Sequence, residues 1–240
     1  MRDLSSRTSG DQGMSLAELL VVMLVSSVVL LAVGTTVATS LRLSVEVNSR
    51  TATTADARLA AEVVARRLRV AVRPPSVGSV FVSAGPSAVS FYASLAMHGG
   101  YPTVDPSGAT TALAPTLVDY RVDPTTSCLR ETLTRGVPVT APDGSTSYSF
   151  TGPSTERCLA SSQVVADSVP LFGYFATGTG ATPVSIGAGS TDPVLLDTIH
   201  SVEVDLRLQE PNQPGVTPMQ VRTRVTLVNR LAEDVVKGIA

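Results

Sequence analysis

The feature that most restricts the fold of this chain is an apolar stretch from Met14 to Val37 with a single charged residue, Glu18. As an α-helix, about 24 residues span roughly 36 Å, which exceeds the ~30 Å hydrocarbon core of a bilayer. Apolar residues occupy nearly every position around this helix, whereas a core helix of a soluble protein has a polar side. The stretch therefore predicts a transmembrane helix over residues 14–37.

Two simpler interpretations of this stretch explain less. A secretory signal peptide has an apolar region of about 7–15 residues and ends in a small-residue cleavage site, but this stretch is longer and has a carboxylate near its start. An ordinary signal anchor explains the length but not Glu18, because a carboxylate at the centre of a membrane helix costs about 2.5–3.5 kcal/mol. The alternative to a specific partner for Glu18 is a side chain that reaches the lipid headgroups.

The residues before the apolar stretch resemble a known processing signal. Gly13, Met14 and Glu18 stand in the segment GMSLAELLVV. This segment resembles the class III signal of type IV prepilins, in which a glycine precedes the cleavage point and glutamate is the fifth residue of the mature chain. The resemblance implies a leader peptide of residues 1–13, cleavage after Gly13 by a prepilin peptidase, and methylation of the new N-terminus at Met14. The near-zero net charge of the leader departs from the more basic leaders that are common in this family.

The same resemblance implies an assembly role for Glu18. Cleavage would create an α-amine on Met14, and a carboxylate in lipid is tolerated when the ammonium group of another subunit lies beside it. In filaments of this family, that pairing sets the register between neighbours. The implied partners are prepilin peptidase, other pilins or pseudopilins through the N-terminal helix, the cytoplasmic membrane and the filament assembly machinery.

A second, amphipathic half of the helix is predicted over residues 38–73. The chain has no proline before Pro74-Pro75, and these two residues end any helix. One helix over Ser15–Val72 would be roughly 85 Å long. Gly34 is either a point at which this helix bends or an ordinary lipid-facing residue. The predicted apolar stripe of the second half comprises Ala52, Ala55, Leu59, Val63 and Val70.

The composition then changes to that of a β-rich globular domain, predicted over residues 74–230 and followed by a tail of residues 231–240. Short runs rich in Val, Phe, Tyr and Thr are separated by Pro, Gly and Ser. The predicted strands are Ser79–Ser83, Ala88–Leu95, Thr116–Val122, Cys128–Thr134, Ser145–Phe150, Val169–Ala176, Ile199–Leu208 and Met219–Val228. The last two alternate apolar and charged residues, as half-buried antiparallel strands do.

The predicted fold class is therefore α+β, with a long N-terminal helix packed on an antiparallel β-rich domain, the lollipop architecture that the prepilin signal implies. The segments VDYRVDPTTSCLRETLTR, VADSVPLFGYFA and IHSVEVDLRL are similar to segments of the PilW-like minor pilins and of the J class of type II secretion pseudopilins. That similarity implies a minor pilin or pseudopilin, with other minor pilins as the main alternative.

Cys128 and Cys158 are the only cysteines. In an exported domain they would form a disulfide that closes a loop of about 30 residues and stabilises the fold by roughly 3–4 kcal/mol in the loop-entropy model. The alternative is two buried free thiols. Neither cysteine belongs to a CxxC motif, so metal and redox motifs are not supported.

The sequence gives little indication of catalysis. It contains no HExxH, P-loop, EF-hand or Rossmann motif, and its histidines, His98 and His200, accompany no GxSxG motif. Asp143, Asp192 and Asp197 lie in predicted loops, where they would either bind calcium or be solvated. We expect no enzyme activity, no cofactor and no metal. The net charge of −2 and the absence of Trp give no sign of direct nucleic-acid binding.

These features predict a structural subunit of a type IV pilus or of a type II secretion-like filament. The protein would be a single-pass cytoplasmic membrane protein whose C-terminal domain lies outside the cytoplasm. The main alternative is a membrane-anchored extracellular binding or adhesion domain that does not polymerise. A third hypothesis, an anchored hydrolase, would need a catalytic triad that uses His98 or His200.

Overall fold

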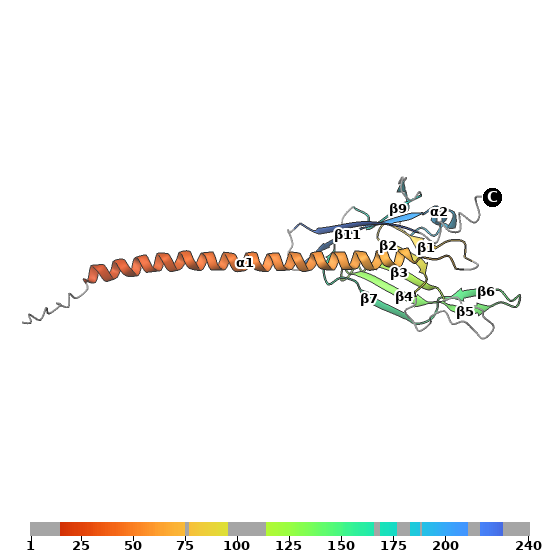
Figure 1. The fold of residues 1–240 in the computed structure, drawn as a ribbon, viewed down its shortest axis with the longest axis horizontal. Coiled ribbons are helices and arrows are strands. Elements are labelled where there is room, and N and C mark those ends of the chain that lie inside the picture. Colours follow the sequence, from red (N-terminus) through yellow and green to blue (C-terminus); the bar gives the residue numbers. More distant parts are fainter. Residues whose placement is uncertain are drawn as a thin grey trace, which may run out of the picture. The chain divides into compact units, whose positions relative to one another are not determined.

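A computed structural model describes residues 15–74, 77–95, 114–165, 169–176, 183–187, 189–210 and 217–227 of the chain. In these residues it contains a long helix, a short helix and twelve strands (Figure 1). The chain divides into two compact units, Met1–Ser49 and Arg50–Ala240. The architecture of a long apolar helix and an antiparallel β domain confirms the predicted α+β class.

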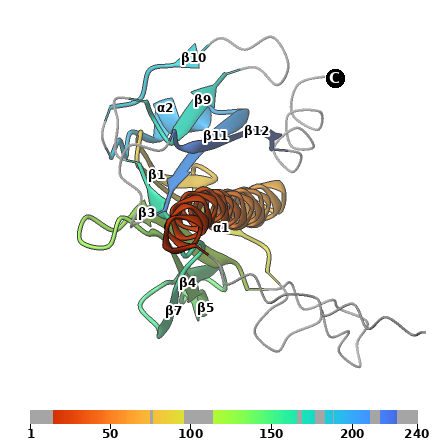
Figure 2. The same ribbon diagram turned by 90° about the vertical axis from the view of Figure 1, so that its left-hand side faces the viewer.

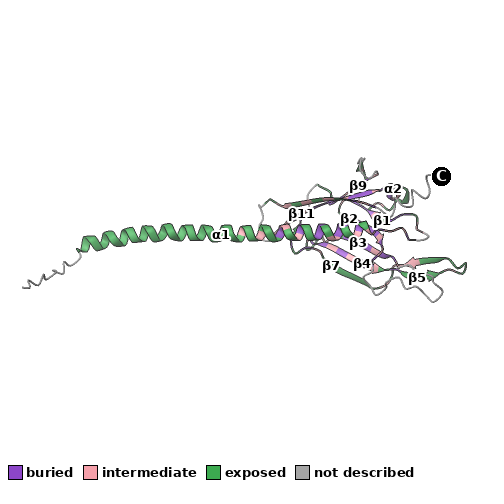
Figure 3. Cartoon of the chain, in the orientation of Figure 1, coloured by how far each residue is buried: buried purple, intermediate pink, exposed green. Residues whose placement is uncertain are grey.

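Helix α1 runs from Leu16 to Arg69 without interruption. Every residue from Ser15 to Val45 is exposed, as Figure 3 shows by the continuous green of this part. The helix ends three residues before the predicted end at Val72, because the backbone turns into the β domain there. The Val72 amide donates to the Tyr92 carbonyl at 2.9 Å, and Ala71 forms a β-bridge with a residue of the first sheet.

The part of α1 that belongs to the second unit has one buried face, and the predicted stripe on it was wrong. Ala52, Ala55 and Leu59 are exposed, and Val63 and Val70 are only half-buried. Most of the buried positions are alanine, a residue that occurs on several sides of this helix, so the apolar pattern alone did not mark the buried face. The buried residues are Thr53, Ala57, Ala60, Ala61, Val64, Ala65 and Leu68.

The first sheet of the second unit is antiparallel, with the order β1-β2-β3-β4-β7. Thr116–Val122 was predicted with its observed bounds, and the bounds of the other predicted strands of this sheet differ from the observed ones by at most two residues. The strands are β1 (Phe81–Ala84), β2 (Ala88–Ala93), β3 (Thr116–Val122), β4 (Leu129–Arg135) and β7 (Ser154–Cys158).

The second sheet has the order β10-β9-β11-β12, with β8 also paired to β11. As predicted, β11 buries its apolar residues, whereas the arginines of β12 are exposed. The short helix α2 (Pro193–Asp197) precedes β11. The strands are β8 (Gln163–Val164), β9 (Phe172–Phe175), β10 (Pro183–Val184), β11 (Ser201–Gln209) and β12 (Met219–Thr226).

A separate hairpin consists of β5 (Val137–Thr140) and β6 (Thr146–Ser149). Of the strands in the described residues, β5, β7, β8 and β10 were not predicted. Two of them contain proline, which weakens a strand prediction. The strand β7 is polar and wholly exposed, so it lacks the apolar alternation that marks a strand, and β8 is only two residues long.

One core joins α1 to both sheets. Figure 2 shows α1 end-on, with β11 and β12 on one side and β4 and β7 on the other. The core cluster contains Val64 and Leu68 of α1, Phe91 of the first sheet, and Val204 and Leu206 of the second. Because each sheet buries its inner face against this helix, α1 is an integral part of the domain core.

A buried carboxylate connects α1 to the first sheet. Glu131 on β4 is fully buried and accepts hydrogen bonds from Tyr120 Oη at 2.7 Å and Arg157 Nε at 2.6 Å. Arg67 of α1 approaches the same carboxylate at 3.5 Å. Burial raises the pKa of Tyr120 well above its ordinary value, and the Glu131 carboxylate raises it further, so the phenol remains a donor at neutral pH.

The burial pattern of α1 is tested by a matched pair of leucine substitutions. Leu68 is 0 % exposed and Leu59 is 60 % exposed. We expect Leu68→Ala to lower the free energy of unfolding by about 2–5 kcal/mol, because it leaves a cavity. We expect Leu59→Ala to change it by less than about 0.5 kcal/mol. Denaturant unfolding of the full chain in detergent, followed by near-UV circular dichroism, gives both values. A larger effect for Leu59→Ala would contradict the observed face.

Candidate functional site: the exposed apolar half of α1

The first half of α1 presents apolar side chains on all sides. The most apolar 18-residue window in this helix has a mean hydropathy of 2.7, and none of it is buried. Leu30 and Leu31 expose 71 % and 72 % of their surface. Exposed apolar area of this extent is unfavourable in water. By length and composition, α1 is a helix that can cross a membrane.

Four hydroxyl groups in this half are bonded within the helix. An unpaired hydroxyl in hydrocarbon costs several kcal/mol, and a bond to the preceding turn avoids that cost. Gly34 lies in the same region, inside the continuous helix, and a Cβ atom at this position would have open space. The bonds run from Ser27 to the Leu24 carbonyl at 2.8 Å, from Thr35 and Thr36 to the Ala32 carbonyl at 2.9 and 2.8 Å, and from Thr39 to the Thr35 carbonyl at 2.8 Å.

Glu18 lies in the first turn of α1, in a position that favours a carboxylate. Ser15 directly precedes the helix, and its carbonyl accepts from the Leu19 amide at 3.1 Å. The spacing of Ser15 and Glu18 is that of a capping box, and negative charge near a helix N-terminus is favoured by the macrodipole. Sequence reasoning did not use this Ser-x-x-Glu spacing, although it is visible in the sequence.

Within the described part of the chain, Glu18 has no ion-pair or hydrogen-bond partner beyond its own helix. Its neighbours on α1 are apolar and exposed. Gly13 and Met14, the predicted processing residues, lie outside the described residues. The arrangement is thus a single acidic group among exposed apolar side chains.

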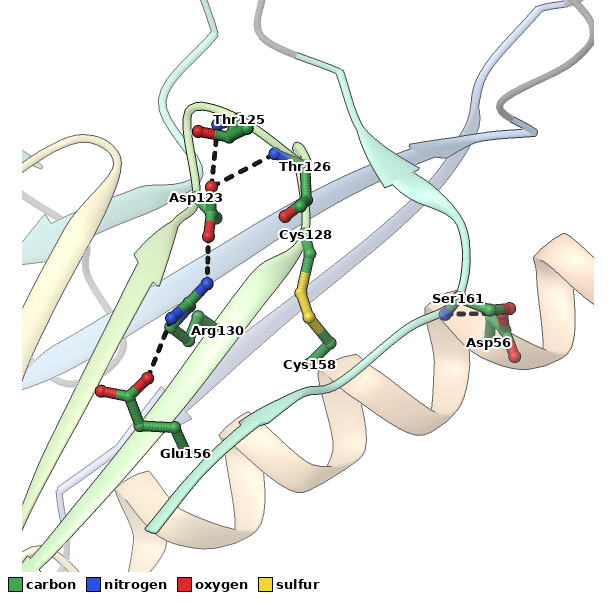
Figure 4. The surroundings of a disulfide bond; sticks show 9 residues. All are labelled: Asp56, Asp123, Thr125, Thr126, Cys128, Arg130, Glu156, Cys158 and Ser161. Carbon is green, nitrogen blue, oxygen red and sulfur yellow. Dashed lines mark hydrogen bonds and ion pairs between the residues drawn. A yellow bond between two sulfur atoms is a disulfide. The ribbon is translucent and has the colours of Figure 1, made fainter. Parts of the chain in front are cut away.

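Cys128 and Cys158 form a disulfide with a Cα–Cα distance of 5.8 Å (Figure 4). Cys128 directly precedes β4 and Cys158 ends β7, so the bond joins an edge strand to its neighbour. All residues of β7 are exposed. The attachment of β7 therefore depends on this bond, on the backbone pairing with β4 and on a few polar side chains.

Those polar contacts surround the disulfide in Figure 4. Arg130 on β4 donates to Glu156 on β7 at 2.9 Å and also pairs with Asp123. Amide groups of the following turn donate to the Asp123 carboxylate and, with Arg130, lower its pKa. Asp56 of α1 accepts from the Ser161 amide at 3.2 Å, just after the disulfide.

The other residues considered for chemistry have local structural roles. The His200 ring bonds a backbone carbonyl, and Asp197 pairs with an arginine. Asp192 caps α2, and Asp143 accepts hydrogen bonds within the turn of the β5–β6 hairpin. No group of three metal-ligating side chains occurs among the described residues. His98 lies outside them.

Comparisons with protein-family models, with curated proteins and with solved structures found no match. The likeness of the residues around Glu18 to a prepilin signal therefore stays a prediction.

Removal of the disulfide is expected to destabilise the β domain. The variant with both Cys128→Ser and Cys158→Ser should lose about 3–4 kcal/mol of unfolding free energy, because a loop of 30 residues is no longer closed in the unfolded chain. Denaturant unfolding in detergent measures the loss. The native chain in a strong reductant should reach the same stability as the variant. Equal stability of the oxidised native chain and the variant would contradict this structural role.

Proposed function

We propose that this chain is a membrane-anchored structural subunit of a type IV pilus or of a type II secretion-like filament, a minor pilin or pseudopilin. The observation that carries the proposal is the exposed apolar half of α1 with Glu18 as its one acidic group. Membrane anchoring alone accounts for the apolar surface. A counter-charge from a neighbouring subunit accounts for the acid as well.

The α-amine of a processed neighbour is the proposed counter-charge. A carboxylate and an ammonium group that pair in a medium of low dielectric attract each other far more strongly than in water. The pairing would therefore select one axial position of one apolar helix against the next, which apolar packing alone does not fix. The helix that carries Glu18 also supplies Val64 and Leu68 to the core of the β domain. Assembly through α1 would therefore also place the β domain in the filament.

The first test of this proposal concerns processing. We expect coexpression with a prepilin peptidase to give a mature chain that begins at Met14 and carries a methyl group on its α-amine. Intact-mass and N-terminal peptide mass spectrometry measure this. The same cells without the peptidase should retain residues 1–13. A mature chain that begins elsewhere, or a chain that stays uncut, would argue against the proposal.

The second test separates the charge of Glu18 from its capping role. Glutamine also fits a capping box but carries no charge, whereas leucine has neither property. We expect Glu18→Gln and Glu18→Leu both to insert in the membrane and both to lower incorporation into filaments by about tenfold or more. Loss of one partner of a buried charge pair costs about 2–5 kcal/mol, and 1.4 kcal/mol is tenfold.

Quantitative immunoblots of sheared filaments against membrane fractions measure that incorporation. If Glu18→Gln behaves as the native chain and only Glu18→Leu fails, capping is the role of Glu18 and the ion pair is refuted. If both variants retain full localisation and activity, the chain is an anchored binding domain that does not polymerise.

A further inference from the structure

Two charged residues, Glu18 and Arg42, bound an uncharged stretch of the exposed half of α1. Arg42 follows Glu18 by 24 residues, and no residue between them is charged. Both residues are exposed and belong to one uninterrupted helix, within the first compact unit, Met1–Ser49. The distance between the two charges along the helix axis is therefore set by the helix itself.

Arg42 is the only basic residue from Ser15 to Ser49. Its guanidinium group has no ion pair or hydrogen bond within the described part of the chain. Apolar side chains continue up to it, since Leu41 exposes 63 % of its surface. A guanidinium group binds phosphate through two parallel hydrogen bonds. The long side chain of an arginine near the end of a membrane helix reaches the headgroups, where phospholipids carry their phosphate.

The separation of the two charges matches the thickness of a bilayer. At 1.5 Å per residue, 24 residues span roughly 36 Å, and a typical tilt of about 20° reduces this to roughly 34 Å across the membrane. The hydrocarbon core is ~30 Å thick. A shift of α1 along its axis by more than about 3 Å would therefore carry one of the two charges into hydrocarbon, which is costly for either group.

The apolar stretch alone predicts a different depth. A span of residues 14–37 has its centre between Val25 and Ser26, and Glu18 would then lie roughly 11 Å from the bilayer centre, inside the hydrocarbon. A span bounded by the two charges has its centre at Leu30 and places both charges roughly 18 Å from it, level with the headgroups. The two depths differ by roughly 7 Å.

We propose that Arg42 binds the phosphate of a phospholipid in the leaflet opposite Glu18, and that the two charges together hold α1 with Leu30 at the bilayer centre. Before assembly, Glu18 then lies among headgroups and water. This inference rests on the membrane anchoring in the proposed function and adds the lipid partner of the anchor. Assembly that moves α1 along its axis would bring Glu18 into apolar surroundings, where the amine of a neighbour offsets the cost.

Fluorescence quenching by brominated lipids tests the depth. The full chain is reconstituted in vesicles of phosphatidylcholine and phosphatidylglycerol that contain lipids brominated at defined depths. The native cysteines are bonded to each other, so a bimane label on one introduced cysteine reports alone. We expect the most deeply brominated lipid to quench Leu30→Cys most strongly, and Val25→Cys and Thr35→Cys equally and less. A maximum at Val25 would overturn the proposal.

Substitution of Arg42 tests its part in setting this depth. In Arg42→Leu the next charged residue is Glu46, so the midpoint between the bounding charges moves to residue 32, roughly 3 Å along the helix. We expect quenching at Thr35→Cys then to exceed that at Val25→Cys. Arg42→Lys keeps the positive charge and should leave the two equal. An unchanged profile in Arg42→Leu would contradict the role of Arg42.

Solid-state NMR tests the contact with phosphate. In a chain labelled with ¹³C at the arginine Cζ atoms, dephasing by lipid ³¹P reports guanidinium groups next to phosphate. We expect the native chain to show this dephasing and Arg42→Lys to lose it. The matched control is Arg58→Lys, an exposed arginine 16 residues further along α1, which should retain it. Equal dephasing in the native chain and in Arg42→Lys would overturn the phosphate contact.

These measurements also separate this inference from the proposed function. If no brominated lipid quenches the label at residue 30, α1 does not enter the bilayer, and both proposals are overturned. If quenching is centred on Val25, or if phosphate causes no dephasing, only the role of Arg42 is overturned. The vesicles contain neither peptidase nor other pilins, so a failure of the processing or incorporation tests would leave the depth result unaffected.

Discussion

The structure depends on one helix that must satisfy two environments. From Ser15 to Val45 the surface of α1 is exposed on all sides, and four of its hydroxyl groups bond to its own backbone, which suits a medium without water. From Thr53 to Leu68 the same helix buries one face in the core of a β domain. Most of these buried residues are alanine and valine, so the bulk of that core comes from the aromatic and branched side chains of the strands.

Polar contacts and the disulfide attach the strand of the β domain that has little apolar packing. The edge strand β7 buries no side chain, but the disulfide, Arg130–Glu156 and Arg157–Glu131 join it to its neighbour. Glu131 also accepts from Tyr120 and lies near Arg67 of α1, so one buried carboxylate links a helix and three strands. Removal of one member of such a group is costly, because the charges that remain stay buried without a partner.

Glu18 combines a favourable local position with apolar surroundings on α1. The first turn of α1 suits a carboxylate, which lowers the cost of its presence but does not neutralise its charge. A cation from a second subunit would do so, and this is the physical basis of the proposed filament. In this scheme the acid fixes the register of neighbouring subunits in the membrane.

The sequence by itself determined the features that depend on local pattern. The apolar run predicted a helix long and apolar enough to cross a membrane, alternation predicted β11 and β12, and Pro74 set an upper limit to α1, which ends earlier, at Arg69. Only the tertiary structure decided which face of α1 is buried, since Leu59 and Leu68 are equally apolar but only Leu68 meets the sheets. It also decided that the exposed segment 154–158 is a strand and that Cys128 meets Cys158. Periodicity acts along the chain, whereas burial and strand pairing depend on residues far apart in sequence, which no local pattern reports.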